Sequence, residues 1–148
     1  MALSMVARLR DGRYDAATLR PTVAEWPPHP ARVFCALVAS AHCAEDWDAL
    51  RWLERSGAPE VWADRSASVS RTDSFVVTNQ TESGGGSQFW PGRTNQARSR
   101  ASTTPADEVF AIVWPEADTA GDLLTRLERM ARRVPYVGRS TSLAEVTA

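Results

Sequence analysis

The chain of 148 residues is long enough for one domain whose core needs neither a metal ion nor disulfide bonds. With 43% hydrophobic and 24% charged residues it is close to the globular average, which excludes wholesale disorder, a collagen-like repeat and a membrane bundle. All 17 basic residues are Arg and stand against 18 acidic ones, so the net charge of −1 predicts no partner. The absence of Lys excludes a P-loop, a Schiff-base enzyme and a Ser-Lys hydrolase.

The first third of the sequence predicts one strand and two helices. Apolar residues in Ala2–Leu9 stop at a polar break at Asp11-Gly12, which is typical of a strand that ends in a turn. After a run of prolines, Pro30 can occupy the first turn of a helix that continues to about His42. The apolar residues of this helix keep the helical spacing: Val33, Phe34, Leu37, Val38 and Ala41. A second helix is expected over Glu45–Arg55.

The middle of the chain, residues 65–105, is rich in Ser, Thr, Asn, Gln, Gly and Arg and poor in apolar residues. We expect a strand over Ser66–Thr78 and a flexible tip at the Gly-rich run of residues 82–87. These features predict a long hairpin or loop.

The last third predicts strand, helix and strand. The apolar run Glu108–Trp114 indicates a central strand that is buried on both faces. Asp118-Thr119 can cap a helix, and a loop over Val134–Ser140 leads to a last strand, Leu143–Val146. The helix keeps its apolar period at Leu123, Leu124, Leu127, Met130 and Ala131.

In order, these elements predict an α+β fold with the ferredoxin-like (RRM-like) βαββαβ plan, as a single domain over residues 1–148. Residues 65–105 form a flexible, thumb-like hairpin insertion in this plan.

The sequence offers little for catalysis or metal binding. Cys35 and Cys43 lie roughly 12 Å apart in one expected helix, beyond disulfide reach, and are interpreted as buried thiols of a cytoplasmic protein. His29 and His42 fit neither a catalytic arrangement nor a zinc spacing, so we expect structural roles for them. We therefore expect no catalytic residue, metal or cofactor in this segment. Because no apolar run has the length of a signal peptide or a membrane span, we also expect a cytoplasmic location without membrane contact.

Charge is separated along the chain. Residues 65–104 contain five Arg and two acidic residues, whereas residues 41–64 contain two Arg and six acidic residues. Arginines interleaved with Phe89 and Trp90 are typical of a segment that contacts RNA phosphates and stacks on bases, although a solvated loop has the same composition.

Three short motifs carry a family resemblance: Gly12-Arg13-Tyr14, Glu25-Trp26-Pro27-Pro28 with Pro30 and Arg32, and Tyr136-Val137-Gly138-Arg139-Ser140. With them the sequence resembles the CRISPR-associated RAMP-superfamily fusion subunit of type I-U (also called I-G) effector complexes, in which a Cas-five-like part precedes a Cas-six-like part. The chain matches the N-terminal, Cas-five-like part. His29 and Ala31 depart from the pattern, which has a small hydroxyl residue and an aromatic one there.

The resemblance implies a ferredoxin-like fold and a role in antiviral defence. It implies that the protein grips and caps the 5′ handle of the guide RNA (crRNA) in a Cascade-type surveillance complex. The implied partners are the guide RNA, the CRISPR backbone subunits, the large subunit and, through the complex, target DNA. Family members are longer, and their RNA-cleaving activity lies in the C-terminal part, so we assign no nuclease to this segment.

The predicted RNA-binding residues fall in two groups. One is a rim at the end of the first strand and in the loop before the last strand: Arg13, Tyr14, Gly138, Arg139 and Ser140. There Tyr14 would stack on a base and Gly138 would allow close approach of the backbone; a surface turn with an ion pair is the alternative. The other group lies in the hairpin: Arg71, Trp90, Arg93, Arg98 and Arg100. We expect Arg71–Thr104 to be mobile in the free protein and ordered by RNA and the adjacent backbone subunit.

Two other functions remain open. The chain could be a protein-interaction element that docks the backbone and large subunits through Trp47, Trp52 and Trp62, although these side chains also suit a core. It could also belong to a crRNA-processing endoribonuclease if the C-terminal part follows it. A dimeric ferredoxin-like enzyme or ligand binder is disfavoured because no catalytic set is recognisable.

Overall fold

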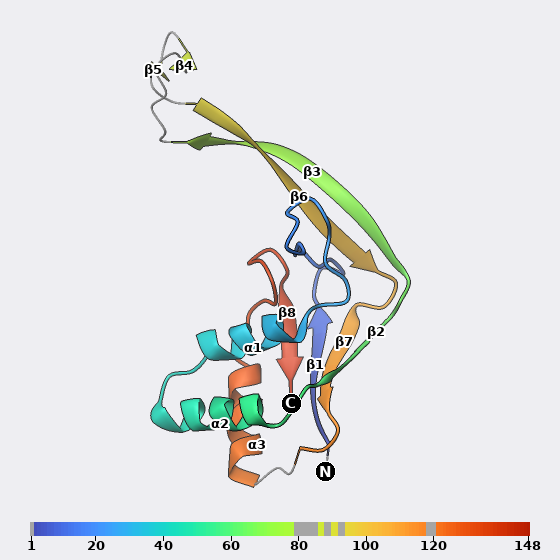
Figure 1. The fold of residues 1–148 in the computed structure, drawn as a ribbon, viewed down its shortest axis with the longest axis vertical. Coiled ribbons are helices and arrows are strands. Elements are labelled where there is room, and N and C mark those ends of the chain that lie inside the picture. Colours follow the sequence, from blue (N-terminus) through green and yellow to red (C-terminus); the bar gives the residue numbers. More distant parts are fainter. Residues whose placement is uncertain (1, 79–85, 88–89, 92–93, 118–120) are drawn as a thin grey trace.

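The computed structural model describes residues 2–78, 86–87, 90–91, 94–117 and 121–148. Its centre is a four-stranded antiparallel sheet of β1 (Leu3–Leu9), β2 (Glu60–Ala63), β7 (Val109–Trp114) and β8 (Ala144–Thr147), in the order β2-β7-β1-β8. The helices α1 (Pro30–Ala39), α2 (Ala44–Arg55) and α3 (Gly121–Ala131) lie together on one side of this sheet (Figure 1). This is the ferredoxin-like α+β fold, as predicted, with α2 as an addition to the first helix.

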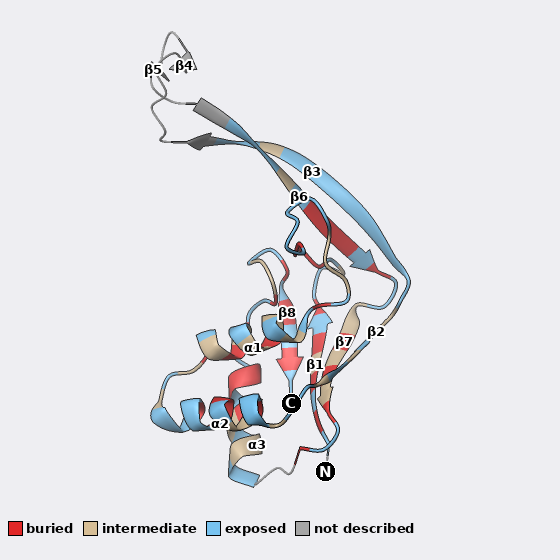
Figure 2. Ribbon diagram, in the orientation of Figure 1, coloured by how far each residue is buried: buried red, intermediate tan, exposed pale blue. Residues whose placement is uncertain are grey.

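The core lies between the sheet and the helices (Figure 2). Along β1, Leu3, Met5 and the other odd-numbered residues are buried, because successive side chains of a strand point to opposite faces. In β7 the alternate residues from Phe110 to Trp114 are buried, and those between them are only half-buried. The prediction that this strand is buried on both faces is therefore wrong, because the described helices cover one face of the antiparallel sheet and leave the other open.

The first helix ends earlier than expected, at Ala39 rather than at His42. The hydroxyl of Ser40 donates to the carbonyl of Ala36, and the N–H of His42 donates to Asp46 in the first turn of α2. The chain therefore turns between two helices.

Because of this turn, the two cysteines do not share a helix, and neither is buried as predicted. Cys35 is exposed on α1, and Cys43 is the half-buried N-cap of α2.

The second strand of the sheet differs from the prediction. It is the short β2, whereas the predicted strand over Ser66–Thr78 is β3 (Ala67–Thr78), which pairs with β6 (Thr94–Pro105) in a separate two-stranded sheet. The hairpin of β3 and β6 projects from the body of the molecule (Figure 1), with β4 (Gly86–Ser87) paired to β5 (Trp90–Pro91) beyond it. Only four residues long, β2 has too little alternation to be recognised beside the longer strand.

The other elements follow the sequence closely. The predicted cap of the last helix at Asp118-Thr119 lies outside the described residues, and Leu127, Met130 and Ala131 of α3 are buried as the helical period predicts. The last strand, β8, is displaced by one residue from its predicted range. In the described ranges, no helix has both the length and the apolar character needed to cross a membrane.

Candidate nucleic-acid interface

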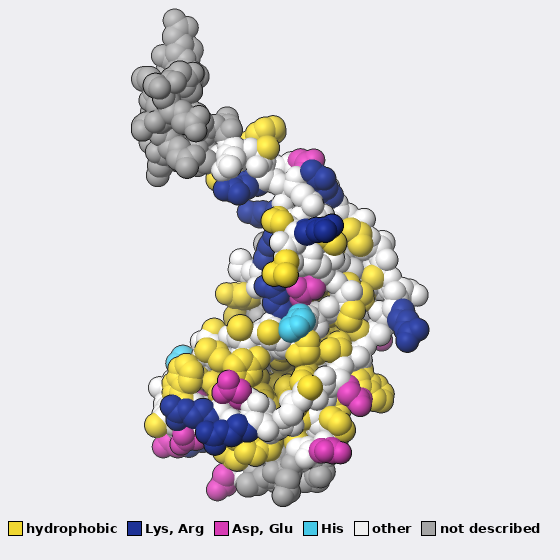
Figure 3. Space-filling model, viewed as in Figure 1, with side chains coloured by type: hydrophobic (Ala, Val, Ile, Leu, Met, Phe, Trp, Pro, Cys, Tyr) yellow, Lys and Arg dark blue, Asp and Glu magenta, His cyan; other side chains and the backbone are white. Residues whose placement is uncertain are grey.

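Two distant segments of the chain, β6 and the loop before β8, form the walls of one cavity of about 560 Å³, which we call the arginine cavity. Arg98 and Arg100 come from β6, and Arg139 comes from the loop. The full lining is Pro21, Val76, Arg98, Ser99, Arg100, Tyr136, Gly138, Arg139, Ser140 and Thr141. These lining residues include no carboxylate, so the cavity is strongly basic although the chain has a net charge of −1. On the face shown in Figure 3, Arg side chains follow the hairpin toward the body of the molecule.

The pairing of β6 with β3 decides which hairpin arginines reach this cavity. Arg98 and Arg100 lie two residues apart and therefore on the same face of the hairpin, opposite Ser74 and Thr72. Arg71 lies opposite Ala101, on the other face, where its guanidinium binds Asp73 at 3.1 Å and the hydroxyl of Ser99 at 2.7 Å. The structure therefore separates Arg71 from the two arginines with which it was predicted to act.

The loop that contains Arg139 is held in place by main-chain hydrogen bonds. Val137 donates to the carbonyl of Ser142, and Ser142 donates to the carbonyl of Arg139. The N–H of Arg139 donates to the carbonyl of Asp15 at 3.1 Å. The Nη1 atom of Arg139 is buried and has no hydrogen-bond partner among the described residues. A buried, unpaired guanidinium nitrogen costs free energy.

Tyr14 does not lie on the predicted rim. Its side chain is 0% exposed, and its ring packs edge-on against Trp26 and Phe110. Its hydroxyl donates to Glu25 Oε1 at 3.0 Å. Burial, reinforced by the neighbouring Glu25 carboxylate, raises the pKa of the Tyr14 hydroxyl, which therefore remains a donor. Because the ring is enclosed by protein, the prediction that Tyr14 stacks on an RNA base is wrong.

Gly138 makes its close approach to this buried tyrosine. Its φ of +87° belongs to the left-handed region, and a Cβ there would lie 3.1 Å from Tyr14 Cε2 and 3.3 Å from the Asp15 carbonyl. A glycine is thus required at this position for packing, whether or not RNA approaches the same loop.

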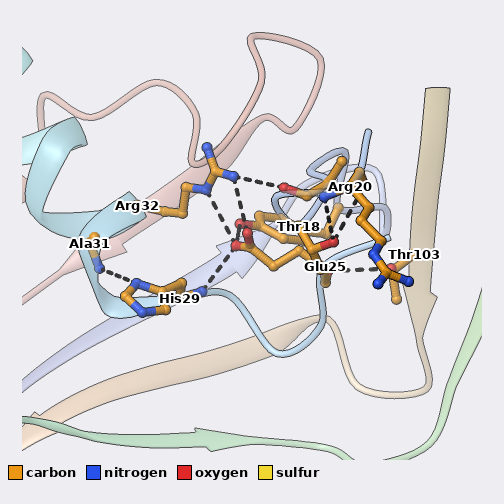
Figure 4. Close-up of polar contacts among 9 residues, drawn as sticks. Thr18, Arg20, Glu25, His29, Ala31, Arg32 and Thr103 are labelled. Carbon is orange, nitrogen blue, oxygen red and sulfur yellow. Dashed lines mark hydrogen bonds and ion pairs between the residues drawn. The ribbon is translucent and has the colours of Figure 1, made fainter. Parts of the chain in front are cut away.

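Glu25, from the Glu-Trp-Pro-Pro motif, joins three segments (Figure 4). Its carboxylate accepts hydrogen bonds from the Tyr14 hydroxyl, the His29 backbone N–H and the Arg32 guanidinium. Its backbone carbonyl accepts from the Thr103 hydroxyl at the base of β6. Burial would raise the pKa of Glu25, but the hydrogen bonds from Arg32, His29 and Tyr14 outweigh it and lower the pKa. The motif therefore has a structural function, which is to hold the loop 13–29 against α1 and the hairpin.

Arg13 lies outside the arginine cavity, because its half-exposed guanidinium binds Asp15 at 3.0 Å. Of the other predicted residues, Gly138, Arg139 and Ser140 line the cavity. Arg93 and the side chain of Trp90 lie outside the described part of the chain.

The sequence predictions missed Tyr136 as a site residue. Its side chain lines the arginine cavity and is 39% exposed. In the structure Tyr136 pairs with Leu143 and precedes the buried Val137. The alternation of an exposed and a buried residue that is typical of a strand was the signal available in the sequence.

Comparison with known proteins places the chain among CRISPR-associated proteins. The family model described as "CRISPR-associated protein, GSU0054 family" matches residues 5–142, which is nearly the whole chain and includes all three sequence motifs. A search of curated proteins finds no match. The chain therefore belongs to the GSU0054 family of CRISPR-associated proteins.

Proposed function

We propose that this chain is a guide-RNA-binding module of a type I CRISPR effector complex, and that the arginine cavity holds the backbone of the 5′ handle. Family membership supports the CRISPR-related role in antiviral defence. The observation that carries the proposal is the convergence of Arg98, Arg100 and Arg139 from two distant segments on one cavity without a carboxylate in its lining.

The chemistry of the cavity suits a phosphodiester. Each guanidinium presents a planar fork of donors that matches two phosphate oxygens. A cavity of about 560 Å³ also has room for a sugar beside the phosphate. Val76 and Pro21 supply apolar surface against which a ribose can pack. Main-chain hydrogen bonds position Arg139 before RNA arrives, which lowers the entropy cost of binding.

The test is RNA binding by a triple variant, Arg98→Ala/Arg100→Ala/Arg139→Ala. Fluorescence anisotropy with an RNA that carries the repeat-derived 5′ handle should show a loss of affinity of roughly tenfold or more. The matched control is Arg51→Ala/Arg55→Ala/Arg129→Ala, which removes the same charge from exposed helical positions. A scrambled handle sequence provides the specificity control.

Equal losses in the two triple variants would show that only total charge matters, and the site assignment would then fail. Equal affinity for the handle RNA and the scrambled RNA would contradict the proposal that the cavity binds the 5′ handle specifically.

In this proposal, the module binds RNA and does not cleave it. His29 uses Nδ1 to cap α1, where it accepts a hydrogen bond from the Ala31 N–H at 3.2 Å. In the described ranges, no cluster of three His, Cys, Asp or Glu residues could hold a metal ion. Repeat RNA incubated with the 148-residue chain should remain intact on a denaturing gel, and cleavage that disappears in His29→Ala or His42→Ala would overturn this point.

Within the family, the Glu25-Trp26-Pro27-Pro28 motif favours the RAMP fusion subunit of type I-U (I-G) complexes. The neighbouring reading frame provides the test. Continuation into a second ferredoxin-like unit beside CRISPR repeats is expected, and a different subunit architecture would contradict the assignment.

Docking of backbone and large subunits is a second candidate function, favoured by exposed apolar side chains. Trp47 and Trp62 are 43% and 63% exposed, so they are not core residues, whereas Trp52 is half-buried against the core. Val69 and Phe75 lie on the face of the hairpin opposite Arg98 and are 66% and 76% exposed. Pull-down of the backbone subunits before and after ribonuclease treatment separates the two functions, because protein docking survives the loss of RNA.

A further inference from the structure

A second cavity adjoins the arginine cavity and has a different chemical character. It has a volume of about 500 Å³ and lies between α1 and the segment that follows α3. Tyr136 and Gly138 line both cavities, so the two adjoin at these residues. The remaining lining residues are Arg32, Cys35, Ala36, Ala39, Ser40, His42, Arg133 and Pro135. We call it the tyrosine cavity.

Tyr136 is an exposed aromatic ring on a fixed backbone. The residue pairs with Leu143, and the carbonyl of Pro135 accepts a hydrogen bond from the Ala144 N–H at 3.1 Å. The next side chain, Val137, is 0% exposed, which fixes the loop to the core. A ring held in this way stacks on a planar ligand without first losing backbone entropy.

The walls of the tyrosine cavity combine apolar surface with positive charge. Cys35, Ala36 and Ala39 present small side chains on the α1 wall, which leaves space for a flat ring. Arg133 contacts Asp46 only at 3.7 Å, longer than a hydrogen bond, and its side chain is 40% exposed. Its guanidinium therefore has donors left for an anion. No carboxylate occurs among the lining residues of this cavity either.

We infer that the tyrosine cavity binds one nucleobase of the RNA strand whose backbone occupies the arginine cavity, with the base stacked on Tyr136 and an adjacent phosphate near Arg133. This inference rests on the proposed function. Because Tyr136 lines both cavities, a strand that leaves the arginine cavity can turn one base into the second cavity. Recognition of single strands by stacking of unpaired bases on aromatic side chains is the usual mode for RNA.

The test uses 2-aminopurine placed at each position of the handle RNA in turn. At one position its fluorescence should fall on binding, since stacking on Tyr136 quenches it. Tyr136→Ala should remove that quenching and weaken binding about tenfold, whereas Tyr136→Phe should retain both, because stacking needs the ring and not the hydroxyl. An abasic nucleotide at the same position should weaken binding to the wild-type protein and have no further effect on Tyr136→Ala.

A cavity-filling variant provides a second measurement. Ala39 is exposed on α1 and lines the tyrosine cavity, so Ala39→Trp should block the base and lower affinity while the fold is retained. Ala58→Trp places the same bulk at an exposed position outside the cavity and should bind normally.

The outcomes separate this inference from the proposed function. If the arginine triple variant loses binding but Tyr136→Ala and Ala39→Trp bind as the wild type does, the base lies elsewhere and only the inference falls. If the triple variant also binds normally, the inference and the proposed function are both contradicted.

Discussion

Tyr14 and Glu25 form a buried hydrogen bond where the loop after β1, helix α1 and the hairpin meet. Tyr14→Phe leaves the ring packing intact but removes one donor from the Glu25 carboxylate. We expect a loss of unfolding free energy of about 1 to 2 kcal/mol, measured by urea denaturation. RNA affinity should be unchanged, because the ring is enclosed. Tyr136→Phe is the matched control and should leave stability unaltered; a loss of RNA affinity in Tyr14→Phe alone would show that the Tyr14 hydroxyl contributes to RNA binding.

Gly138 provides a second test at the residue scale. In Gly138→Ala the new Cβ would meet Tyr14 Cε2 at 3.1 Å on top of the cost of a positive φ, so we expect destabilisation of about 2 to 3 kcal/mol. Gly12→Ala is the matched control, since Gly12 has a φ of +61° and a Cβ added there would have no other atom within 4 Å. It should cost only about 1 kcal/mol. Equal losses in the two variants, measured by thermal unfolding, would exclude the packing argument.

Stability should fall in acid because several carboxylates, Glu25 and Asp46 among them, have lowered pKa values in the folded protein. Hydrogen bonds from Arg32, His29 and Tyr14 act on Glu25 against its burial, and the His42 backbone N–H acts on Asp46. The pKa values of the unfolded chain are about 4.3 for Glu and 3.9 for Asp. At pH values between these and the lower folded pKa values, the unfolded chain binds more protons than the folded protein does. The contribution of these groups is therefore complete above about pH 5 and is lost as pH falls through the folded pKa values.

The measurement is the urea midpoint between pH 3 and pH 7. Glu25→Gln removes one of these groups and should flatten the profile below pH 5. A variant profile parallel to that of the wild type would show that Glu25 does not contribute to the pH dependence.

At the scale of elements, the hairpin has a buried base and an exposed body. Ala101 and Thr103 of β6 are 1% and 0% exposed, and Tyr14 and Thr103 exchange two main-chain hydrogen bonds of 2.8 Å. By contrast, Phe75 is 76% exposed on the neighbouring strand. The base therefore belongs to the core, whereas the body depends on the pairing of two strands, which is marginal in water.

Hydrogen exchange should reveal this difference. We expect slow amide exchange at Thr103 and faster exchange at residues 96–99, because local opening requires loss of few buried contacts there. Protection of residues 96–99 that appears only with guide RNA and the backbone subunit would support the predicted ordering on assembly. Equal protection along β6 in the free protein would contradict it.

At the scale of the molecule, the fold gathers positive charge that the composition does not reveal. The net charge is −1, yet Arg98, Arg100 and Arg139 meet in one cavity, and Arg133 lines the next. Binding should therefore depend steeply on salt, because each phosphate contact releases counterions from the RNA.

This dependence gives a quantitative prediction. Removing three phosphate contacts in Arg98→Ala/Arg100→Ala/Arg139→Ala should reduce the slope of log K against log salt by about 2, at roughly 0.7 for each contact with a single strand. The control variant Arg51→Ala/Arg55→Ala/Arg129→Ala should keep the wild-type slope. A common slope for all three proteins would mean that these arginines do not contact phosphates.

The sequence by itself determined most of the elements, because their signals are local. The alternation in Leu3–Leu9, the helical period that ends at Ala131 and the polar segment 65–105 each predict an element from neighbouring residues, and the structure confirms the ferredoxin-like plan. The short strand Glu60–Ala63 escaped prediction because four residues hold too little periodicity.

Only the tertiary structure decided which side chains form the site. Burial of Tyr14 depends on Trp26, Phe110 and Gly138, which come from three other parts of the chain. The arginine cavity likewise needs the loop of Arg139 beside a hairpin that lies far earlier in the sequence. Such contacts follow from how the sheet, the helices and the loops pack, and packing is a non-local property that neither composition nor spacing contains.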